Sequence, residues 1–90
     1  MLIEFDTAKR SATLDERGLD MARADEIFVG AHMTVQDARK DYGEIRNITI
    51  GFLDSRMVVM VWTQRGEVVR IISLRKANDR EQEIHSPRLR

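Results

Sequence analysis

The chain has 90 residues, of which 42% are hydrophobic and 33% charged. This composition is typical of one small folded domain and argues against a disordered chain. The chain contains no cysteine, which excludes disulfide bridges and thiolate zinc sites. No apolar run is long enough to span a membrane and nothing resembles a signal peptide, so we expect a cytoplasmic protein.

The net charge is zero, but the charges are unevenly distributed along the chain. Residues 1–55 carry seven Lys and Arg against eleven Asp and Glu, whereas residues 56–90 carry eight against four. A neutral protein can present a basic face in this way, and such a face attracts a polyanion. A solvated basic tail gives the same count, so both interpretations stay open.

The N-terminal segment is predicted to form a strand and a helix. Residues 2–5, Leu-Ile-Glu-Phe, are mainly apolar and typical of an edge strand. Asp6 or Thr7 then supplies the capping side chain of a helix that runs to about Glu16, and Gly18 is a typical helix stop.

A second helix is predicted to follow directly, with Asp20 as its cap. Its apolar stripe consists of Met21, Ala24, Ile27 and Phe28. Residues 31–40 alternate weakly, and we expect a short strand there before a turn-like polar loop over residues 37–43.

The next predicted strand covers residues 44–52. By the two-residue period of a strand, Glu44 and Arg46 should share a face with its apolar side chains. Asp54 and Ser55 then turn the chain into the following hairpin.

That hairpin, over residues 56–76, is the main feature of the predicted sheet. Residues 57–63 are almost all apolar, which is typical of a strand buried on both faces. Gly66 supplies the turn, and residues 68–74 form an apolar returning strand.

Arg70 interrupts this returning strand. A guanidinium among apolar side chains is costly unless it is paired, so Arg70 either pairs with Glu44 or Glu67 or serves a ligand. In a regular strand Arg70 and Arg75 point to opposite faces, and they converge only if a bulge or the end of the strand redirects one of them.

A third helix is predicted over residues 77–85, capped by Asn78 or Asp79, and order is expected to end at Pro87. We therefore predict a single domain over residues 1–86 and a disordered tail over residues 87–90. The predicted fold class is α+β, with a mainly antiparallel sheet of four or five strands, two N-terminal helices and one C-terminal helix. The helices are expected on one side of the sheet.

Several separated fragments occur in a characteristic order. They are Phe5-Asp6-Thr7-Ala8-Lys9, Gly18-Leu19 before the helix from Ala24 to Phe28, Gly43-Glu44-Ile45-Arg46, Gly51 after Thr49, and Arg70-Ile71-Ile72-Ser73-Leu74-Arg75-Lys76-Ala77 followed by Arg80-Glu81. Together they resemble the BrnT toxins of bacterial type II toxin–antitoxin modules, whose fold is similar to that of RelE ribonucleases.

The resemblance implies a toxin that cleaves mRNA without a metal ion or other cofactor. It also implies a BrnA-like antitoxin with a ribbon-helix-helix domain as partner in a hetero-oligomer. The chain departs from the family pattern at Glu16-Arg17-Gly18, where members usually have Lys-His-Gly, and at His85, where Tyr is common. These departures favour a second interpretation, a degenerate toxin homologue that only binds the antitoxin. A third is a small nucleic-acid-binding domain.

Cleavage of RNA in this way requires three things. The 2′-hydroxyl must lose a proton, the charged phosphorane must be neutralised, and the 5′-oxygen must gain a proton. Arginine suits the second step because its planar fork binds two phosphate oxygens and keeps its charge. The candidate catalytic residues are Arg70, Arg46, Glu44, Arg75 and His85, and the candidate RNA-binding residues are Lys76, Lys9, Arg17 and Arg80.

Structural alternatives apply to several of these residues. Glu44 either acts as general base, orients Arg46 and Arg70, or is an exposed carboxylate at the end of a loop. His85 is either a proton shuttle or a surface residue, and Lys9 either contacts RNA or pairs with Asp6. No metal site is expected, because His32 and His85 are far apart in a chain without cysteine. If the assignment is right, Arg46, Arg70 and Arg75 should gather in one pocket.

Overall fold

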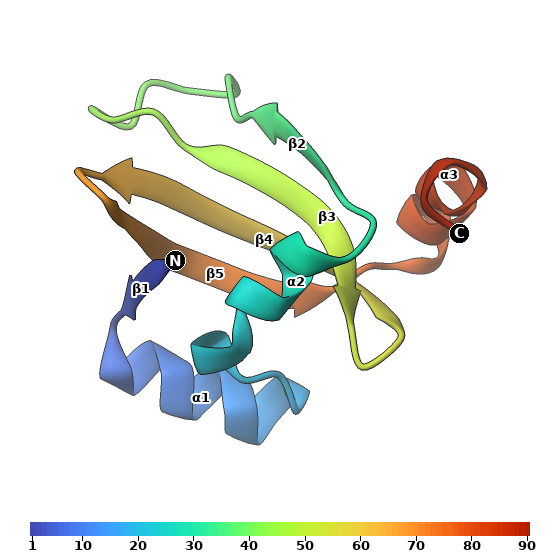
Figure 1. The fold of residues 1–90 in the computed structure, drawn as a ribbon, viewed down its shortest axis with the longest axis horizontal. Helices are drawn as coiled ribbons and strands as arrows, with labels where there is room; N and C mark the ends of the chain where they lie inside the picture. Colours follow the sequence, from blue (N-terminus) through green and yellow to red (C-terminus); the bar gives the residue numbers. More distant parts are fainter.

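The computed structural model describes residues 1–90 and shows an open five-stranded sheet with three α-helices (Figure 1). The elements in chain order are β1 (Leu2–Phe5), α1 (Thr7–Arg17), the 3-10 helix η1 (Met21–Arg23), α2 (Asp25–Val29), β2 (Met33–Gln36), β3 (Asn47–Leu53), β4 (Arg56–Arg65), β5 (Val68–Lys76) and α3 (Asp79–Leu89). No helix is long and apolar enough to cross a membrane.

The strand order is β1-β5-β4-β3-β2. β1 runs parallel to β5, and the other neighbours are antiparallel. The predicted fold class, α+β with a mainly antiparallel sheet, is therefore confirmed.

The predicted caps of the first helix are present. The Asp6 side chain accepts a hydrogen bond from the Lys9 amide, and Gly18, at φ 69°, ends the helix in the left-handed conformation that favours glycine.

The second helix differs from the prediction because it is divided into η1 and α2. Asp20 caps η1 as predicted. The fully buried residues of the segment are Met21, Ala24 and Ile27, which are spaced three apart. This spacing matches the period of a 3-10 helix better than that of an α-helix, which accounts for the tighter first turn.

The start of β3 also differs from the prediction, because the strand begins at Asn47 and not at Glu44. The Ile45 carbonyl accepts a hydrogen bond from the Thr63 hydroxyl, and the Arg46 carbonyl accepts one from the Asp37 amide. Glu44 and Arg46 therefore belong to the loop that joins β2 to β3.

The prediction that all helices lie on one side of the sheet is wrong. The larger core cluster joins one face of the sheet to η1 and α2, with Leu19, Met21, Ile27 and Met60 among its members. A smaller cluster on the other face includes Met57 and Val59, against which Leu89 of α3 packs. The sheet is thus covered by the N-terminal helices on one face and by α3 over part of the other.

Helix α3 continues beyond the position at which order was predicted to end. Asn78 and Glu81 form a capping box at its start, and Pro87 lies inside its last turn. Leu89 packs against the smaller core cluster, and the Arg90 guanidinium lies 4.5 Å from the centre of the Phe52 ring. These contacts are the physical reason why the helix continues to Leu89.

A bulge in β5 changes which side chains share a face. Val61 is opposite Ser73 but Trp62 is opposite Ile71, so Ile72 is an extra residue in β5. Arg70 is opposite Thr63 and Arg75 is opposite Val59, two positions of β4 that lie on the same face. The bulge therefore places Arg70 and Arg75 on one face, as their convergence required.

Candidate active site

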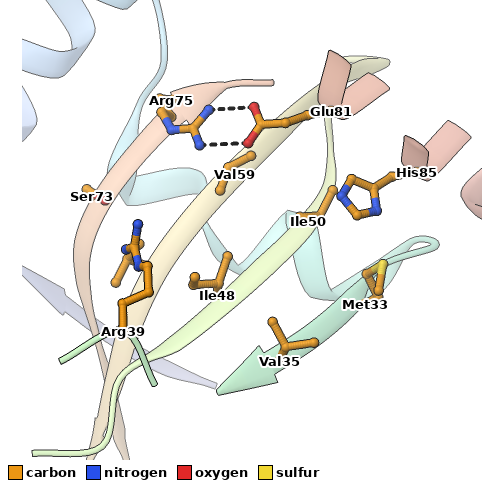
Figure 2. Close-up of a pocket in the computed structure, with 11 residues that line it drawn as sticks. Met33, Val35, Arg39, Ile48, Ile50, Val59, Ser73, Arg75, Glu81 and His85 are labelled. Carbon is orange, nitrogen blue, oxygen red and sulfur yellow. Dashed lines mark hydrogen bonds and ion pairs between the residues drawn. The ribbon is translucent and has the colours of Figure 1, made fainter. Parts of the chain in front are cut away.

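A cavity of about 440 Å³ lies on the α3 face of the sheet (Figure 2). Its floor is apolar and consists of Met33, Val35, Ile48, Ile50, Val59 and Val61. Its polar side chains are Arg39, Ser73, Arg75, Glu81 and His85. The residues come from four strands, one loop and α3, so only the folded chain brings them together.

Arg75 enters the cavity from β5 and is held by Glu81 of α3. Its two terminal nitrogens lie 2.7 and 2.8 Å from the two carboxylate oxygens of Glu81, a bidentate geometry. The Arg75 guanidinium lowers the pKa of Glu81 to about 2, although partial burial acts in the opposite direction. The Glu81 carboxylate in turn raises the pKa of Arg75, so both groups are ionised at neutral pH.

Arg39 is the second cation of the cavity, and it comes from the loop between β2 and β3. Asp37, whose side chain is only 1% exposed, accepts hydrogen bonds from Arg39 Nε and Nη2, both at 2.8 Å. The Asp37 carboxylate also accepts hydrogen bonds from the Arg39 amide and the Tyr42 hydroxyl. The hydrogen bonds from Arg39 lower the pKa of Asp37 below its ordinary value. Figure 2 shows Arg39 extending over the floor on the side of Arg75.

His85 lines the opposite end of the cavity, from the second half of α3. Its Nδ1 is buried and has no hydrogen-bond partner. Figure 2 shows the ring beside Ile50, below the Arg75–Glu81 pair. An imidazole can donate or accept a proton near neutral pH, but the buried Nδ1 is not exposed to a ligand in this conformation.

Arg70 and Arg46 do not line this cavity. Arg70 lies beside Glu4 of β1, with 3.6 Å between nitrogen and oxygen, so its partner is neither Glu44 nor Glu67 as predicted. Arg46 lies 3.4 Å from Glu44, and its guanidinium stacks 4.2 Å from the centre of the Tyr42 ring. The expectation that Arg46, Arg70 and Arg75 gather in one pocket is therefore wrong, because only Arg75 reaches it.

Glu44 lies between two arginines outside the cavity. One carboxylate oxygen is 3.4 Å from Arg46, and the other is 3.4 Å from Arg65. The alternative in which Glu44 orients Arg46 and Arg70 therefore matches for Arg46 only, because the second arginine beside Glu44 is Arg65.

The candidate RNA-binding residues are distributed over different surfaces. Lys9 and Arg17 of α1 donate hydrogen bonds to the Ile72 and Leu74 carbonyls of β5, on the side of the sheet away from α3. Lys76 is opposite Val58, a residue of the larger core cluster, and therefore lies on the face opposite Arg75. Arg80 is exposed in the first turn of α3.

No group of three or more His, Cys, Asp or Glu side chains could hold a metal ion. Positive charge in the cavity comes from the two guanidinium groups, which keep their charge throughout the ordinary pH range.

The sequence interpretation did not identify Arg39, Ser73 or Glu81 as site residues. Arg39 lies in a polar loop whose composition indicates only a turn. The spacing of Asp37 and Arg39 could have indicated an oriented arginine, because an acidic residue at the end of a strand can bind a cationic side chain two positions later. Glu81 was noted only as part of a sequence motif, and its position in the first turn of α3 gave no indication that it would reach Arg75.

Comparisons with known proteins identify the family of the chain. No curated protein sequence matches the chain. The family model described as "Ribonuclease toxin, BrnT, of type II toxin-antitoxin system" matches residues 5–81, which include both strands of the hairpin and the start of α3. The chain therefore belongs to the BrnT family of ribonuclease toxins of type II toxin–antitoxin systems.

Proposed function

We propose that this protein is a metal-independent endoribonuclease toxin and that the cavity beside α3 holds the scissile phosphate of mRNA. One observation carries the proposal: Arg75, Arg39 and His85 line a single cavity above an apolar floor. Guanidinium groups suit phosphate oxygens, imidazole suits proton transfer, and an apolar surface accommodates a nucleobase.

In the proposed reaction, the 2′-hydroxyl attacks the adjacent phosphorus and the bond from phosphorus to the 5′-oxygen breaks. His85 accepts the proton of the 2′-hydroxyl, and the departing 5′-oxygen takes a proton from the imidazolium or from water. Arg75 and Arg39 neutralise the charge that builds on the phosphorane oxygens. Glu81 keeps the Arg75 fork in place while leaving part of its N–H groups free.

The remaining candidates have secondary roles in this proposal. Arg70 lies on the same face as Arg75, so it can contact the RNA backbone further along the sheet. Glu44 and Arg46 stabilise the loop that carries Arg39, through the stacking of Arg46 on Tyr42. Arg80 and Lys76 supply positive charge near the α3 end, where salt-dependent contacts with phosphates are expected.

Membership of a type II toxin family implies an antitoxin partner. We propose that a BrnA-like antitoxin with a ribbon-helix-helix domain covers this cavity in a hetero-oligomer. Acidic side chains of the antitoxin would pair with Arg39 and Arg75, and apolar ones would cover the floor.

The catalytic proposal is tested with purified protein and RNA in the presence of EDTA. We expect the parent to cleave, and Arg75→Met to cleave about 10²–10³ times more slowly, because a charge-stabilising donor is lost. Arg88→Met is the matched control, since Arg88 is exposed in the last turn of α3 and makes no ion pair. A parent that leaves RNA intact, or an Arg75→Met variant as fast as the parent, would contradict the proposal.

The ion pairs of the site favour a second candidate function, a degenerate toxin homologue that binds antitoxin without cleaving RNA. Arg75, Arg39, Arg46 and Arg70 each already have a carboxylate partner. Expression without the antitoxin separates the two functions, because only an active toxin arrests growth and an antitoxin-binding module does not.

A further inference from the structure

The part of β5 that follows the bulge is an unusual strand, because it has a neighbouring strand on one side only. β1 pairs with β5 from Val68 to Ile71 and ends there. Residues 73–76 pair with β4, and neither they nor the bulged Ile72 have a strand on the β1 side. Backbone carbonyls along an unpaired edge need another donor or water.

Helix α1 supplies those donors. Lys9 Nζ donates a hydrogen bond of 2.5 Å to the Ile72 carbonyl, and Arg17 Nη1 donates one of 2.8 Å to the Leu74 carbonyl. Lys9 and Arg17 lie on one side of α1, eight residues or about two turns apart. The two donors therefore bond to the bulged residue itself and to the second residue after it.

The position of the bulge decides where Arg75 points. Without the extra residue at Ile72, the residues after it would exchange faces, because a shift of one residue reverses the side of every side chain. Arg75 would then lie toward α1 and away from Glu81 and the cavity. Hydrogen bonds that hold residues 72–74 in the bulged register thus also hold Arg75 on the cavity face.

We propose that Lys9 and Arg17 are positioning residues, which clamp the bulge of β5 and so keep Arg75 and Ser73 on the face that binds RNA. The expected effect on RNA cleavage rests on the proposed function. The effect on the register of β5 does not, because it depends only on hydrogen bonds to the backbone. The proposal gives a role to two cations that do not line the cavity and whose donors are already bonded to β5 carbonyls.

The test compares the Lys9→Met/Arg17→Met double variant with the parent by NMR and by RNA cleavage. In the parent, nuclear Overhauser effects should join Val59 to Arg75 and Val61 to Ser73, following the bulged register. In the double variant we expect these effects to weaken or shift by one residue. RNA cleavage should fall by about tenfold to a hundredfold, less than for loss of a phosphate donor.

Two further sets of variants separate positioning from stability. Arg10→Met removes another cation of α1, whose side-chain hydrogen bonds go to Asp20 and not to β5. It should lower the melting temperature and leave the register and the cleavage rate unchanged. Lys9→Arg and Arg17→Lys keep a hydrogen-bond donor at each position. These variants should therefore have the parental register and the parental cleavage rate. If the double variant does not fold, the two single Met variants are compared in the same way.

The proposal is overturned if the folded Met variants keep the parental register. It is also overturned if the only effect of each substitution is on the salt dependence of RNA binding. A slope of log affinity against log salt concentration that is smaller by about one unit would indicate a direct contact with a phosphate. A parent that does not cleave RNA would contradict the proposed function, whereas the NMR comparison would still decide whether the clamp exists.

Discussion

At the scale of single residues, the site is built from arginines that carboxylates hold in place. Glu81 fixes Arg75 from α3, and Asp37 fixes Arg39 from the end of β2. Each carboxylate binds its arginine through two hydrogen bonds, which leaves the guanidinium fewer orientations than a single bond would. The cavity therefore presents cations that are oriented before a phosphate arrives, and such preorganisation favours transition-state stabilisation.

Asp37→Asn should reduce RNA cleavage by about tenfold or more, in line with the effect of supporting groups around other functional sites. The substitution removes the charge that holds Arg39 and weakens the acceptor for Tyr42. Cleavage rates and RNA affinity measure the effect, with Asp25→Asn as control because Asp25 is exposed and makes no ion pair. Equal losses in both variants would show that Asp37 has no particular role.

Glu81 makes the stability of the fold depend on pH. Its pKa is about 2 in the folded protein against an ordinary value of 4.5, chiefly because of the hydrogen bonds from Arg75. A carboxyl group whose pKa is lowered by folding stabilises the protein above its unfolded pKa, and this stabilisation is lost as the pH falls. The loss should occur between about pH 4.5 and about pH 2.

Denaturant unfolding at several pH values measures this effect, with Glu81→Gln as the comparison. Asp20, whose pKa is also lowered to about 2 by Arg10, contributes a similar loss in both proteins. The parent should therefore lose more stability than Glu81→Gln over this range. If the free energy of unfolding changed with pH in the same way in both proteins, the Arg75–Glu81 pair would contribute nothing measurable to stability.

At the scale of elements, one close approach fixes the distance between α2 and the sheet. A Cβ atom added at Gly51 of β3 would lie 2.8 Å from Ile27 Cγ2 and 3.2 Å from His32 Cβ. Glycine is therefore required at position 51 because a larger residue would collide with α2. Its backbone conformation does not require glycine, since its φ is not positive.

Gly51→Ala should lower the free energy of unfolding by about 1–3 kcal/mol, the usual cost of overpacking. Gly30→Ala is the matched control, since an added Cβ there meets no atom within 4 Å and φ is −91°. Chemical denaturation of the two variants measures the difference. A Gly51→Ala variant as stable as Gly30→Ala would show that α2 moves away at little cost.

The elements of this fold were largely predictable from the sequence, because their signals are local. Asp6, Gly18 and Asn78 mark helix ends through side-chain caps or a positive φ, and the hairpin follows from its almost continuous apolar runs and its turn glycine. The cavity was less predictable. Arg39 and Arg75 line one cavity only because of the strand order, and the bulge at Ile72 depends on contacts with α1 that no local pattern encodes.

At the scale of the whole molecule, the two faces of the sheet have different tasks. The N-terminal helices bury the larger core cluster on one face, whereas the other face is only partly covered by α3 and contains the cavity (Figure 2). Lys9 and Arg17 connect the two faces through the bulge of β5. One face of the sheet thus contributes most of the hydrophobic core, and the other face contains the proposed RNA-binding cavity.

The most direct test is a crystal structure with a short RNA whose 2′-hydroxyls are methylated, since this RNA binds but lacks the attacking group. We predict that a phosphate of the RNA lies in the cavity, within hydrogen-bond distance of Arg75 and Arg39 and beside His85. RNA bound instead along α1 at Lys9 and Arg17, with the cavity empty, would contradict the account.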